Sequence, residues 1–325
     1  MLFRSAILEL GRALGTLLEE GWGTYHSRGV IMGGTSVKMA CDLLLALEQE
    51  QSLPQRYCLL EVSADLRERQ QQLLGKKIPH LLARVQWLDQ LPARDFNGIV
   101  LANEVLDAMP VHRYLFARGQ LQEAGVKVDG DQFAWTALPL AAGPRHLLES
   151  RLREVMPAWP ENYVIEINLN LAPWFAAAAH RLRDGMILVM DYGYPRREYY
   201  HPQRSAGTLL CHYRHHVHSD PFLFPGLQDI TAAVDFTAVA EAGAAAGLGV
   251  RGYTTQAHFL LACGLTELLE EQAWSPASAR AESSRQARIL TLPGEMGEIC
   301  KVMALTKNLS APLLGFSLVD QRARL

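Results

Sequence analysis

The sequence lacks the short glycine and serine motifs that mark several large enzyme classes. No G-x-G-x-x-G pattern follows a predicted strand and opens a helix, so a nicotinamide-dependent dehydrogenase is poorly supported. There is no G-x-S-x-G elbow, which counts against an α/β-hydrolase, and no Walker A loop. Hydride transfer, serine-based hydrolysis and P-loop chemistry are therefore poor explanations of this chain.

Cysteine pairs, targeting segments and long apolar runs are missing as well. The five cysteines are scattered and show no C-x-x-C spacing, which predicts a reducing compartment without structural disulfides. No signal-peptide pattern opens the chain, and no apolar run approaches the roughly 18 residues of a membrane helix. We therefore expect a cytoplasmic protein with no membrane span.

Charge of neither sign is in large excess. The 325 residues carry a formal net charge of -3, and the isoelectric point is about 6.4. Such a surface has no electrostatic bias toward nucleic acid or anionic membranes, so no nucleic-acid partner is expected. Apolar residues make up 49% of the chain, enough for one large core or one core plus a substantial insertion.

Short apolar runs alternate with helical patterns in the first third of the chain. Strands are predicted at 29–32, 57–62, 85–88 and 98–102, and helices at 5–20, 39–47 and 64–74. This alternation predicts βαβ units, that is, an α/β fold whose mostly parallel sheet carries helices on both faces.

The pattern changes between residues 111 and 140, where Arg118-Gly119 and Asp129-Gly130 separate short strand-like runs. These turn pairs indicate an antiparallel hairpin insertion. Later helices are predicted near 144–155 and at 172–183, 236–246, 256–271 and 279–290, and later strands at 186–190, 248–254 and 298–306. The predicted organisation is a first half at 1–110, an insertion at 111–160, a second half at 161–307 and a tail at 308–325.

Glycines or polar residues stand at the ends of the early strands, at Gly33, Glu61, Asp89 and Asn103. The carboxyl ends of parallel strands meet at one edge of a sheet, and ligands bind there near the switch in strand order. We therefore expect these residues, with Gly34, to line one site. An acid at Glu61 can accept two hydrogen bonds from a ribose; the alternative is a cap for the next helix.

A polar cluster formed by Asn103, Glu104 and Asp107 follows the fourth predicted strand. The amide of Asn103 supplies a donor and an acceptor, and Glu104 can orient a cationic or amine nucleophile. If the chain turns helical here, Asp107 shares a face with Glu104. The alternative is a helix N-cap with a solvated first turn, although Pro110 limits any helix.

The stretch from 192 to 235 has little periodicity and many aromatic residues and histidines, which indicates a functional loop. The run from Cys211 to His218 contains zinc-ligand residue types, but its spacing matches no familiar zinc pattern, so no metal is predicted. His112 and Arg113 line the substrate cleft or simply begin the hairpin. The other expected cleft residues are Asp191, Tyr192, His212, Arg214 and Asp229.

Several motifs, in order, resemble the MidA family of S-adenosylmethionine-dependent methyltransferases. The resemblance extends from about residue 5 to residue 307. The matching segments are Leu60–Ser63, Val100–Arg113, Asp191–Tyr194, Cys211–Arg214, Pro225–Thr231, Asp235–Thr237 and Thr254–Gln256.

The resemblance implies a class I methyltransferase (Rossmann-like) fold: a seven-stranded, mostly parallel sheet with an antiparallel last strand. It also implies the cofactor S-adenosyl-L-methionine. Gly33 falls where the family's cofactor loop begins, and Glu61 where the ribose-binding acid lies. Asp89 follows the third strand, where an adenine contact is expected. Asn103 and Glu104 fall near the transferred methyl group.

The sequence departs from the family pattern in two places. The family's E-x-G-x-G-x-G loop aligns with Ile31 to Val37, where only Gly33 stays in register and Thr35 and Val37 bring Cβ atoms toward the cofactor. The family also carries an N-terminal segment rich in aromatic and glycine residues, and this chain starts after it. That start predicts a fragment, a mispredicted gene product or a member losing activity.

The eukaryotic members of the MidA family are mitochondrial protein-arginine methyltransferases acting in respiratory complex I assembly. The resemblance to this family therefore suggests two functions. The first is methyl transfer to a protein side chain, arginine, by direct displacement, in which Glu104 and Asp107 orient the guanidinium. The second is an assembly or scaffold protein of the same fold that has lost cofactor binding. We expect a protein substrate, and a respiratory-complex subunit is one candidate. The expected location is the bacterial cytoplasm. The oligomeric state stays open, and a homodimer is one possibility.

Overall fold

The computed structural model describes residues 28–33, 37–152, 155, 160–214, 216–271 and 276–325. The chain divides into two compact units, each described by itself below. The first unit contains the chain up to Val105, Trp174–Tyr192 and Ala240–Leu325, and the second contains Leu106–Pro173 and Gly193–Val239. The helix predicted at 5–20 lies outside the described residues, and the segment boundaries predicted at 110, 160 and 307 stay a prediction.

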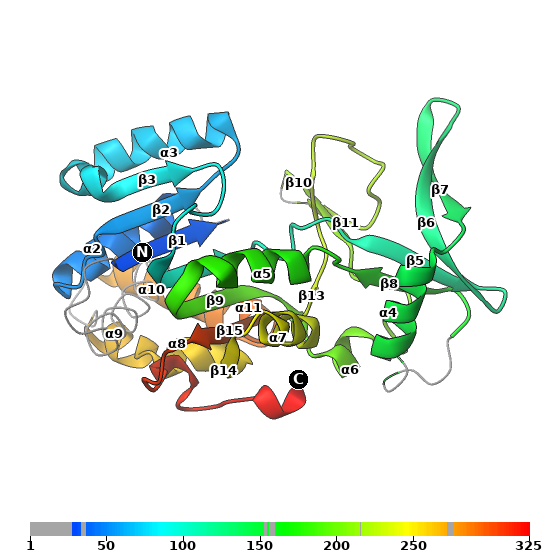
Figure 1. The fold of residues 1–325 in the computed structure, drawn as a ribbon. Coiled ribbons are helices and arrows are strands. Elements are labelled where there is room, and N and C mark those ends of the chain that lie inside the picture. Colours follow the sequence, from blue (N-terminus) through cyan, green and yellow to red (C-terminus); the bar gives the residue numbers. More distant parts are fainter. Residues whose placement is uncertain (1–27, 34–36, 153–154, 156–159, 215, 272–275) are drawn as a thin grey trace. The chain divides into compact units, whose positions relative to one another are not determined.

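A mixed sheet is the framework of the first unit (Figure 1). Its order is β14-β15-β9-β4-β1-β2-β3. The strands are β1 (Arg28–Gly33), β2 (Arg56–Leu60), β3 (Val85–Leu88), β4 (Phe96–Asn103), β9 (Leu182–Tyr194), β14 (Gly249–Thr255) and β15 (Cys300–Lys307). Neighbours from β9 to β3 pair in parallel, whereas β15 is antiparallel to both β9 and β14.

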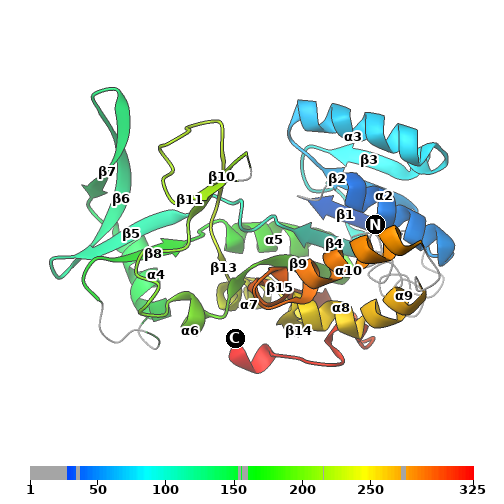
Figure 2. The same ribbon diagram turned by 180° about the vertical axis from the view of Figure 1, so that it is seen from behind.

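The α/β class predicted from the sequence is confirmed. The described sheet counts eight strands rather than seven, because the short β13 (Val234–Asp235) pairs in parallel with the last two residues of β9. Helices connect the strands (Figure 2). They are α2 (Val37–Gln49), α3 (Ala64–Lys77), α5 (Leu171–Arg181), α7 (Phe236–Ala245), α8 (Gln256–Ala262), α9 (Leu265–Glu271), α10 (Ala277–Thr291) and α11 (Met296–Ile299).

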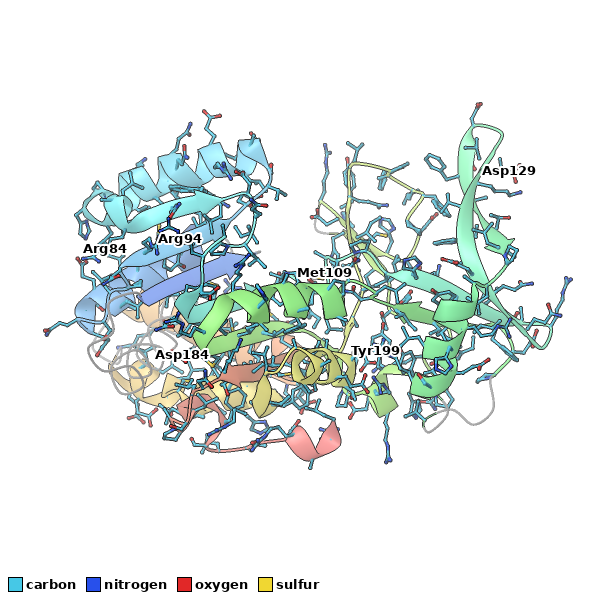
Figure 3. All side chains as sticks on the ribbon, viewed as in Figure 1. Arg84, Arg94, Met109, Asp129, Asp184 and Tyr199 are labelled. Carbon is cyan, nitrogen blue, oxygen red and sulfur yellow. The ribbon has the colours of Figure 1, made fainter. Side chains whose placement is uncertain are left out.

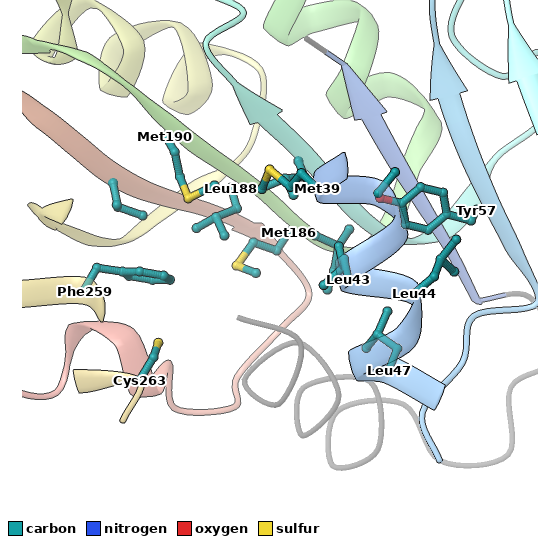
Figure 4. Packing of buried hydrophobic residues seen from close by; sticks show 14 of the residues in the cluster. Met39, Leu43, Leu44, Leu47, Tyr57, Met186, Leu188, Met190, Phe259 and Cys263 are labelled. Carbon is teal, nitrogen blue, oxygen red and sulfur yellow. The ribbon is translucent and has the colours of Figure 1, made fainter. Parts of the chain in front are cut away.

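The core of the first unit lies between this sheet and helices such as α2 and α8 (Figure 4). β4 is buried at every residue except the last, Asn103. A central parallel strand is covered on both faces, which explains its unbroken apolar run. Burial therefore ends where the polar edge of the sheet begins. Packed together are Met39, Leu43, Leu44 and Leu47 of α2, Tyr57 of β2, and Met186, Leu188 and Met190 of β9.

The second unit contains the predicted antiparallel hairpins, joined by one strand that the prediction missed. The four-stranded order is β7-β6-β5-β8, with β5 (His112–Ala117), β6 (Gln120–Asp129), β7 (Gln132–Leu138) and β8 (Tyr163–Ile167). Gly119 and Gly130 have φ values of 69° and 64°, as the two tight turns require. The helix α4 (Ala142–Leu152) contributes Leu148 and Leu152 to this unit's core beside Tyr114 and Ile165.

The stretch from 192 to 235 also contains regular structure. A helical turn, α6 (Arg196–Tyr199), is followed by a small antiparallel sheet of order β11-β10-β12. Its strands are β10 (Leu210–Tyr213), β11 (His216–His218) and β12 (Asp229–Thr231). Strands of three or four residues are too short to show a periodicity, so the sequence pattern missed them.

Several predicted boundaries were wrong. The strand predicted to reach Val62 ends at Leu60, and Gly185, predicted to end a helix, lies inside β9. The helix predicted at 256–271 is two helices, because Gly264 has φ 95° and cannot continue a right-handed helix. None of the helices in the described part of the chain combines the length and apolar character that a membrane-spanning helix needs.

Candidate functional site

Polar and glycine residues gather at the carboxyl edge of the first unit's sheet, as the sequence pattern predicts. Gly33 ends β1 and lies in register between Leu60 of β2 and Ala102 of β4. Glu61 and Asp89 directly follow β2 and β3, whose last residues also pair. Asn103 ends β4. Gly34 lies outside the described residues.

The Glu61 carboxylate is held by two short-range hydrogen bonds. Its Oε1 accepts the backbone N–H of Ser63 (2.9 Å), and its Oε2 accepts Nε2 of Gln70 (3.1 Å). The buried Gln70 is itself oriented, because its Oε1 accepts the indole N–H of Trp87 (2.9 Å). A carboxylate has about four acceptor positions, so each oxygen keeps capacity for one further donor. Glu61 is therefore a fixed acceptor that still has room for a pair of ribose hydroxyls.

Gln70 and Trp87 were missed by the sequence reasoning, and the capping alternative for Glu61 is partly correct. Ser63 is the N-cap of α3, since its side chain accepts the N–H of Leu66 (3.3 Å), and Glu61 binds the Ser63 N–H. One carboxylate thus stabilises the start of a helix and faces the sheet edge. Directly beside it, Val62 exposes 82% of its surface, which is unusual for an apolar side chain.

Asp89 is linked to the neighbouring strand end through Arg67, another residue without a sequence signal. The Arg67 Nη2 atom lies 2.5 Å from Asp89 Oδ1 and 3.0 Å from the backbone carbonyl oxygen of Glu61. The Asp89 side chain is still 80% exposed. Arg67 therefore fixes the ends of β2 and β3 relative to each other and leaves the Asp89 carboxylate accessible.

The chain leaves β4 through a left-handed residue rather than a helix. Glu104 has φ 51°, and its N–H donates to the carbonyl of Met190 (3.0 Å), which continues the pairing of β4 with β9. Leu106 to Met109 form a turn instead. The expected helical face shared by Glu104 and Asp107 is therefore wrong. Asp107 is buried, and its carbonyl accepts the N–H of Ala232 (3.0 Å) inside the second unit.

Asp191 and Tyr192 lie within β9 instead of after it. They stand opposite Lys301 and Cys300 of β15 in the antiparallel register, and Asp191 is fully buried. The pKa of the Cys300 thiol is raised to about 12 by burial and by the nearby carboxylates of Glu104 and Asp191. These two carboxylates therefore lie at the same part of the sheet edge, and the thiol is kept in its unreactive, protonated form.

The other predicted cleft residues belong to the second unit. His112 Nδ1 lies 3.0 Å from Glu123 Oε1. His212 is exposed on β10, opposite Asp229 of β12 in the register. Its Nε2 lies 3.4 Å from the hydroxyl of Thr231. Arg214 has φ 48°, and its guanidinium lies 5.3 Å from the ring of Tyr213. Their role in a substrate cleft stays a prediction.

Arg113 is engaged by Glu166, a buried carboxylate that the sequence reasoning missed. The Arg113 Nε atom lies 3.5 Å from Glu166 Oε1. Glu166 Oε2 also accepts the N–H and hydroxyl of Thr208 (2.6 and 2.7 Å), and Oε1 accepts the N–H of Leu209 (3.3 Å). The short apolar run Tyr163–Ile167, interrupted by one acid, was the available signal for a strand carrying a buried acid.

Two hollows and the grouping of metal-ligand residue types can be compared with the predicted site residues in the described part of the chain. Within the described ranges, no group of three or more histidine, cysteine, aspartate or glutamate residues could hold a metal ion. A cavity of about 10 Å³ in the second unit, lined by Glu166, Tyr199, Tyr200 and Asp235 among others, has room for about one water molecule. An open hollow of about 510 Å³ in the first unit is lined by residues 90–93 and α5.

Comparison with known proteins places the chain among methyltransferases. A family described as "Putative S-adenosyl-L-methionine-dependent methyltransferase" matches residues 22–254. "Protein arginine methyltransferase NDUFAF7 homolog, mitochondrial" of Drosophila melanogaster is 30% identical over 233 residues, which cover 68% of this chain and 51% of that protein. The Mus musculus "Protein arginine methyltransferase NDUFAF7, mitochondrial" is 26% identical over 312 residues, or 92% of this chain and 66% of the relative. The chain thus spans about half of the fly protein and 66% of the mouse protein.

Two solved structures from Burkholderia thailandensis share the fold along nearly the whole chain. One, a candidate methyl transfer enzyme bound to S-adenosyl-homocysteine, has a TM-score of 0.91 and 38% identity, covering 98% of this chain and 80% of that one. The other, a native crystal structure, has a TM-score of 0.90 and 37% identity, covering 99% and 85%.

Proposed function

This chain belongs to the family of S-adenosyl-L-methionine-dependent methyltransferases whose model it matches, and we propose that it methylates a protein side chain, with arginine as the acceptor. The observation that carries the proposal is the carboxyl edge of the first unit's sheet, where Gly33, Glu61, Asp89 and Asn103 lie together. The relatives named protein arginine methyltransferases support arginine as the acceptor.

Three residues of this edge fit the adenosine part of S-adenosylmethionine. Glu61 would accept hydrogen bonds from the ribose hydroxyls, since both carboxylate oxygens keep acceptor capacity. The exposed apolar side chain of Val62 would cover one face of the adenine ring, and the exposed carboxylate of Asp89 would accept from its amino group. When bound, the cofactor supplies an electrophilic methyl group on a positively charged sulfur.

The acceptor side of the proposed site is formed by Asn103 and Glu104. Glu104 lies near the buried Asp191, which stands opposite the buried Lys301, and the carboxylate of Glu104 would attract and orient a guanidinium. Arginine stays protonated in water because its pKa is above about 12. Methyl transfer would depend mainly on holding the nucleophilic nitrogen in line with the methyl group. As the N–C bond forms and the S–C bond breaks, S-adenosylhomocysteine would leave, and the carboxylate of Glu104 would accept the proton that the nitrogen loses. The role of Asp107 in orienting the guanidinium stays a prediction.

The finer family features belong to the same proposal. The path β3-β2-β1-β4-β9-β15-β14, with β15 antiparallel, supports the class I methyltransferase arrangement. We place the protein in the bacterial cytoplasm and take a protein as its substrate, with a respiratory-complex subunit as one candidate. A homodimer is one of the oligomeric states that fit this proposal.

The second candidate function, a scaffold that has lost cofactor binding, is favoured by the sequence from Ile31 to Val37. The sequence predicts that the Cβ atom of Val37 crowds the cofactor. In the structure, Val37 is the first residue of α2 and its side chain packs against the first unit's core, which weakens this objection. The argument for the scaffold therefore depends on Ile31 and on residues 34–36. Residues 34–36 lie outside the described residues.

A calorimetric titration with S-adenosylmethionine separates the two functions. We expect the folded protein to bind the cofactor and Glu61→Ala to weaken binding about 10- to 100-fold, since charge-assisted hydrogen bonds contribute about 1.5–3 kcal/mol. Glu68→Ala, an exposed acid on α3, is the matched control and should bind like the wild type. A folded wild type without heat at millimolar cofactor would contradict the enzyme and support the scaffold.

The acceptor is tested separately by incubating the protein with radiolabelled S-adenosylmethionine and arginine-containing proteins, followed by amino-acid analysis. Label recovered in methylarginine supports the proposal. Label confined to another side chain would contradict arginine while leaving methyl transfer standing.

A further inference from the structure

The hairpin formed by β6 and β7, residues 120–138, carries an exposed apolar face in the second unit. Cross-strand neighbours on this face are Val126 with Trp135 and Val128 with Phe133. All four side chains are exposed, Val128 to 71%. Exposed apolar surface that is contiguous, rather than scattered, marks an interaction site.

β7 is also an edge strand without the usual protection. It ends the order β7-β6-β5-β8, and among the described residues it pairs with β6 alone. Natural edge strands are commonly protected by lysine or other charges, proline or bulges. The sequence of β7, Gln132–Leu138, contains no charged residue and no proline. Its outer backbone groups can therefore pair with a further strand.

The aromatic part of the face is fixed rather than loose. The ring of Phe222 lies 4.9 Å from Trp135 and 6.3 Å from Phe133. On Trp135, the guanidinium carbon of Arg113 lies 4.9 Å from the ring centre, and Arg113 is itself held by the buried Glu166. A surface that is already ordered loses little side-chain freedom when a partner binds.

Acidic residues lie mainly on the opposite face of the same hairpin, where Glu123 and Asp129 alternate with Val126 and Val128 along β6. The hairpin has three acids and one base, and that base, Lys127, pairs with Asp129 at 3.0 Å. Asp129 lies near the tip of the hairpin (Figure 3), and Asp131 follows in the turn. The segment 216–231, which contains Phe222, has two aspartates and no lysine or arginine. The hairpin therefore complements an extended partner whose apolar side chains meet one face and whose basic side chains meet the other.

We infer that β7 binds an extended segment of the acceptor protein, in which apolar and basic side chains alternate, by strand addition. Main-chain hydrogen bonds to β7 supply affinity. The partner's apolar side chains cover Phe133 and Val128, and its basic side chains point to the opposite face, toward Asp129. This inference rests on the proposed function, because it takes the bound segment to belong to the methylated protein.

The test uses two fluorescent twelve-residue peptides, one alternating valine with arginine and one alternating valine with glutamate. Fluorescence anisotropy should show saturable binding of the valine–arginine peptide and at least tenfold weaker binding of the other. Phe133→Lys should weaken binding of the valine–arginine peptide at least tenfold. Gln120→Lys adds the same charge at an exposed position of β6 beyond the residues that pair with β7, so it should stay within about threefold of the wild type.

Equal binding of both peptides, or equal loss in the two lysine variants, would overturn the inference. So would a dimer in sedimentation that Phe133→Lys dissociates, because β7 would then bind a second copy of this chain. Cofactor titrations run on the same samples keep the two proposals apart. Peptide failure with intact S-adenosylmethionine binding contradicts this inference alone, and a wild type that binds no cofactor contradicts the proposed function.

Discussion

Glu61 of the first unit and Glu166 of the second unit use their carboxylates in opposite ways. In the first unit, each oxygen of Glu61 accepts one hydrogen bond, and Asp89 has one ion pair while staying mostly exposed. In the second unit, Glu166 is buried and accepts from Thr208 and Leu209 beside Arg113. Full burial with three hydrogen bonds and an ion pair indicates a structural acid, whereas partial exposure with spare acceptor capacity at a sheet edge indicates a ligand-binding acid.

The largest expected effect that tests this contrast is the loss of Glu166. Glu166→Ala should lower the free energy of unfolding by about 3–5 kcal/mol, because removal of one partner leaves a buried charge uncompensated. Urea denaturation followed by circular dichroism measures it. Glu149→Ala, an exposed acid on α4, is the control and should change stability by less than about 0.5 kcal/mol. A loss below 1 kcal/mol at Glu166 would remove the contrast.

A smaller effect is expected next to the same carboxylate, at Gly207. This residue has φ 80°, and an added Cβ would lie 2.6 Å from Glu166 Oε1. Gly207→Ala should therefore cost about 1–3 kcal/mol. Gly226→Ala is a matched control, since Gly226 has φ 77° but open space around the added atom. Thermal unfolding measures the loss of stability in both variants, and the larger loss at Gly207 reports the contact with Glu166. Equal losses would show that the Glu166 side chain moves to accommodate the added methyl group.

Asp235, another buried carboxyl of the second unit, should make the stability of the protein depend on pH. Burial raises the pKa of this carboxyl, and the lowering by Arg196 and the Ala238 N–H offsets this only in part. A raised pKa means that the folded state binds the proton more tightly, so this contribution to stability is present at low pH and is lost as pH rises through the folded-state pKa. The stability of the wild type relative to Asp235→Asn should therefore fall as pH rises from about 4 toward neutrality. A difference that is constant over this range would contradict it.

The smallest expected effect on stability is at Glu61. Its hydrogen bonds are local and partly exposed, so Glu61→Ala should change the free energy of unfolding by less than about 1 kcal/mol. Cofactor binding should nevertheless be weakened in the same variant. Urea denaturation tests the small change in stability, and calorimetry on the same preparation tests the weakened cofactor binding. A large loss of stability would place Glu61 with Glu166 as a structural acid.

Much of the fold could be predicted because its signals are local. β3 was predicted residue for residue at Val85–Leu88, and β4 and α2 to within two residues at each end. Apolar runs and helical spacing depend on neighbours in the chain. β8 was missed, although its apolar run was visible. The helices α8 and α9 were merged because the sequence pattern does not report the backbone angle of Gly264.

The site was predicted in outline and not in its contacts. Strand-end positions placed Gly33, Glu61, Asp89 and Asn103 at one edge, since parallel strands bring their carboxyl ends together. The residues that hold them, Gln70 and Arg67, carry no sequence signal. Their bonds to Glu61 and Asp89 join positions on different elements, and many other pairings are equally compatible with the pattern.

By itself, the sequence determined the alternation of strands and helices and the polar residues that end the strands, beginning with the run from Asn103 to Asp107. Both follow from periodicity and turn chemistry, which act over a few residues. Only the tertiary structure decided that Glu104 turns out of the sheet in a left-handed conformation and that Arg113 is held by Glu166. Those outcomes depend on which distant groups are buried together, where an unmatched charge or hydrogen-bonding group is too costly to leave alone.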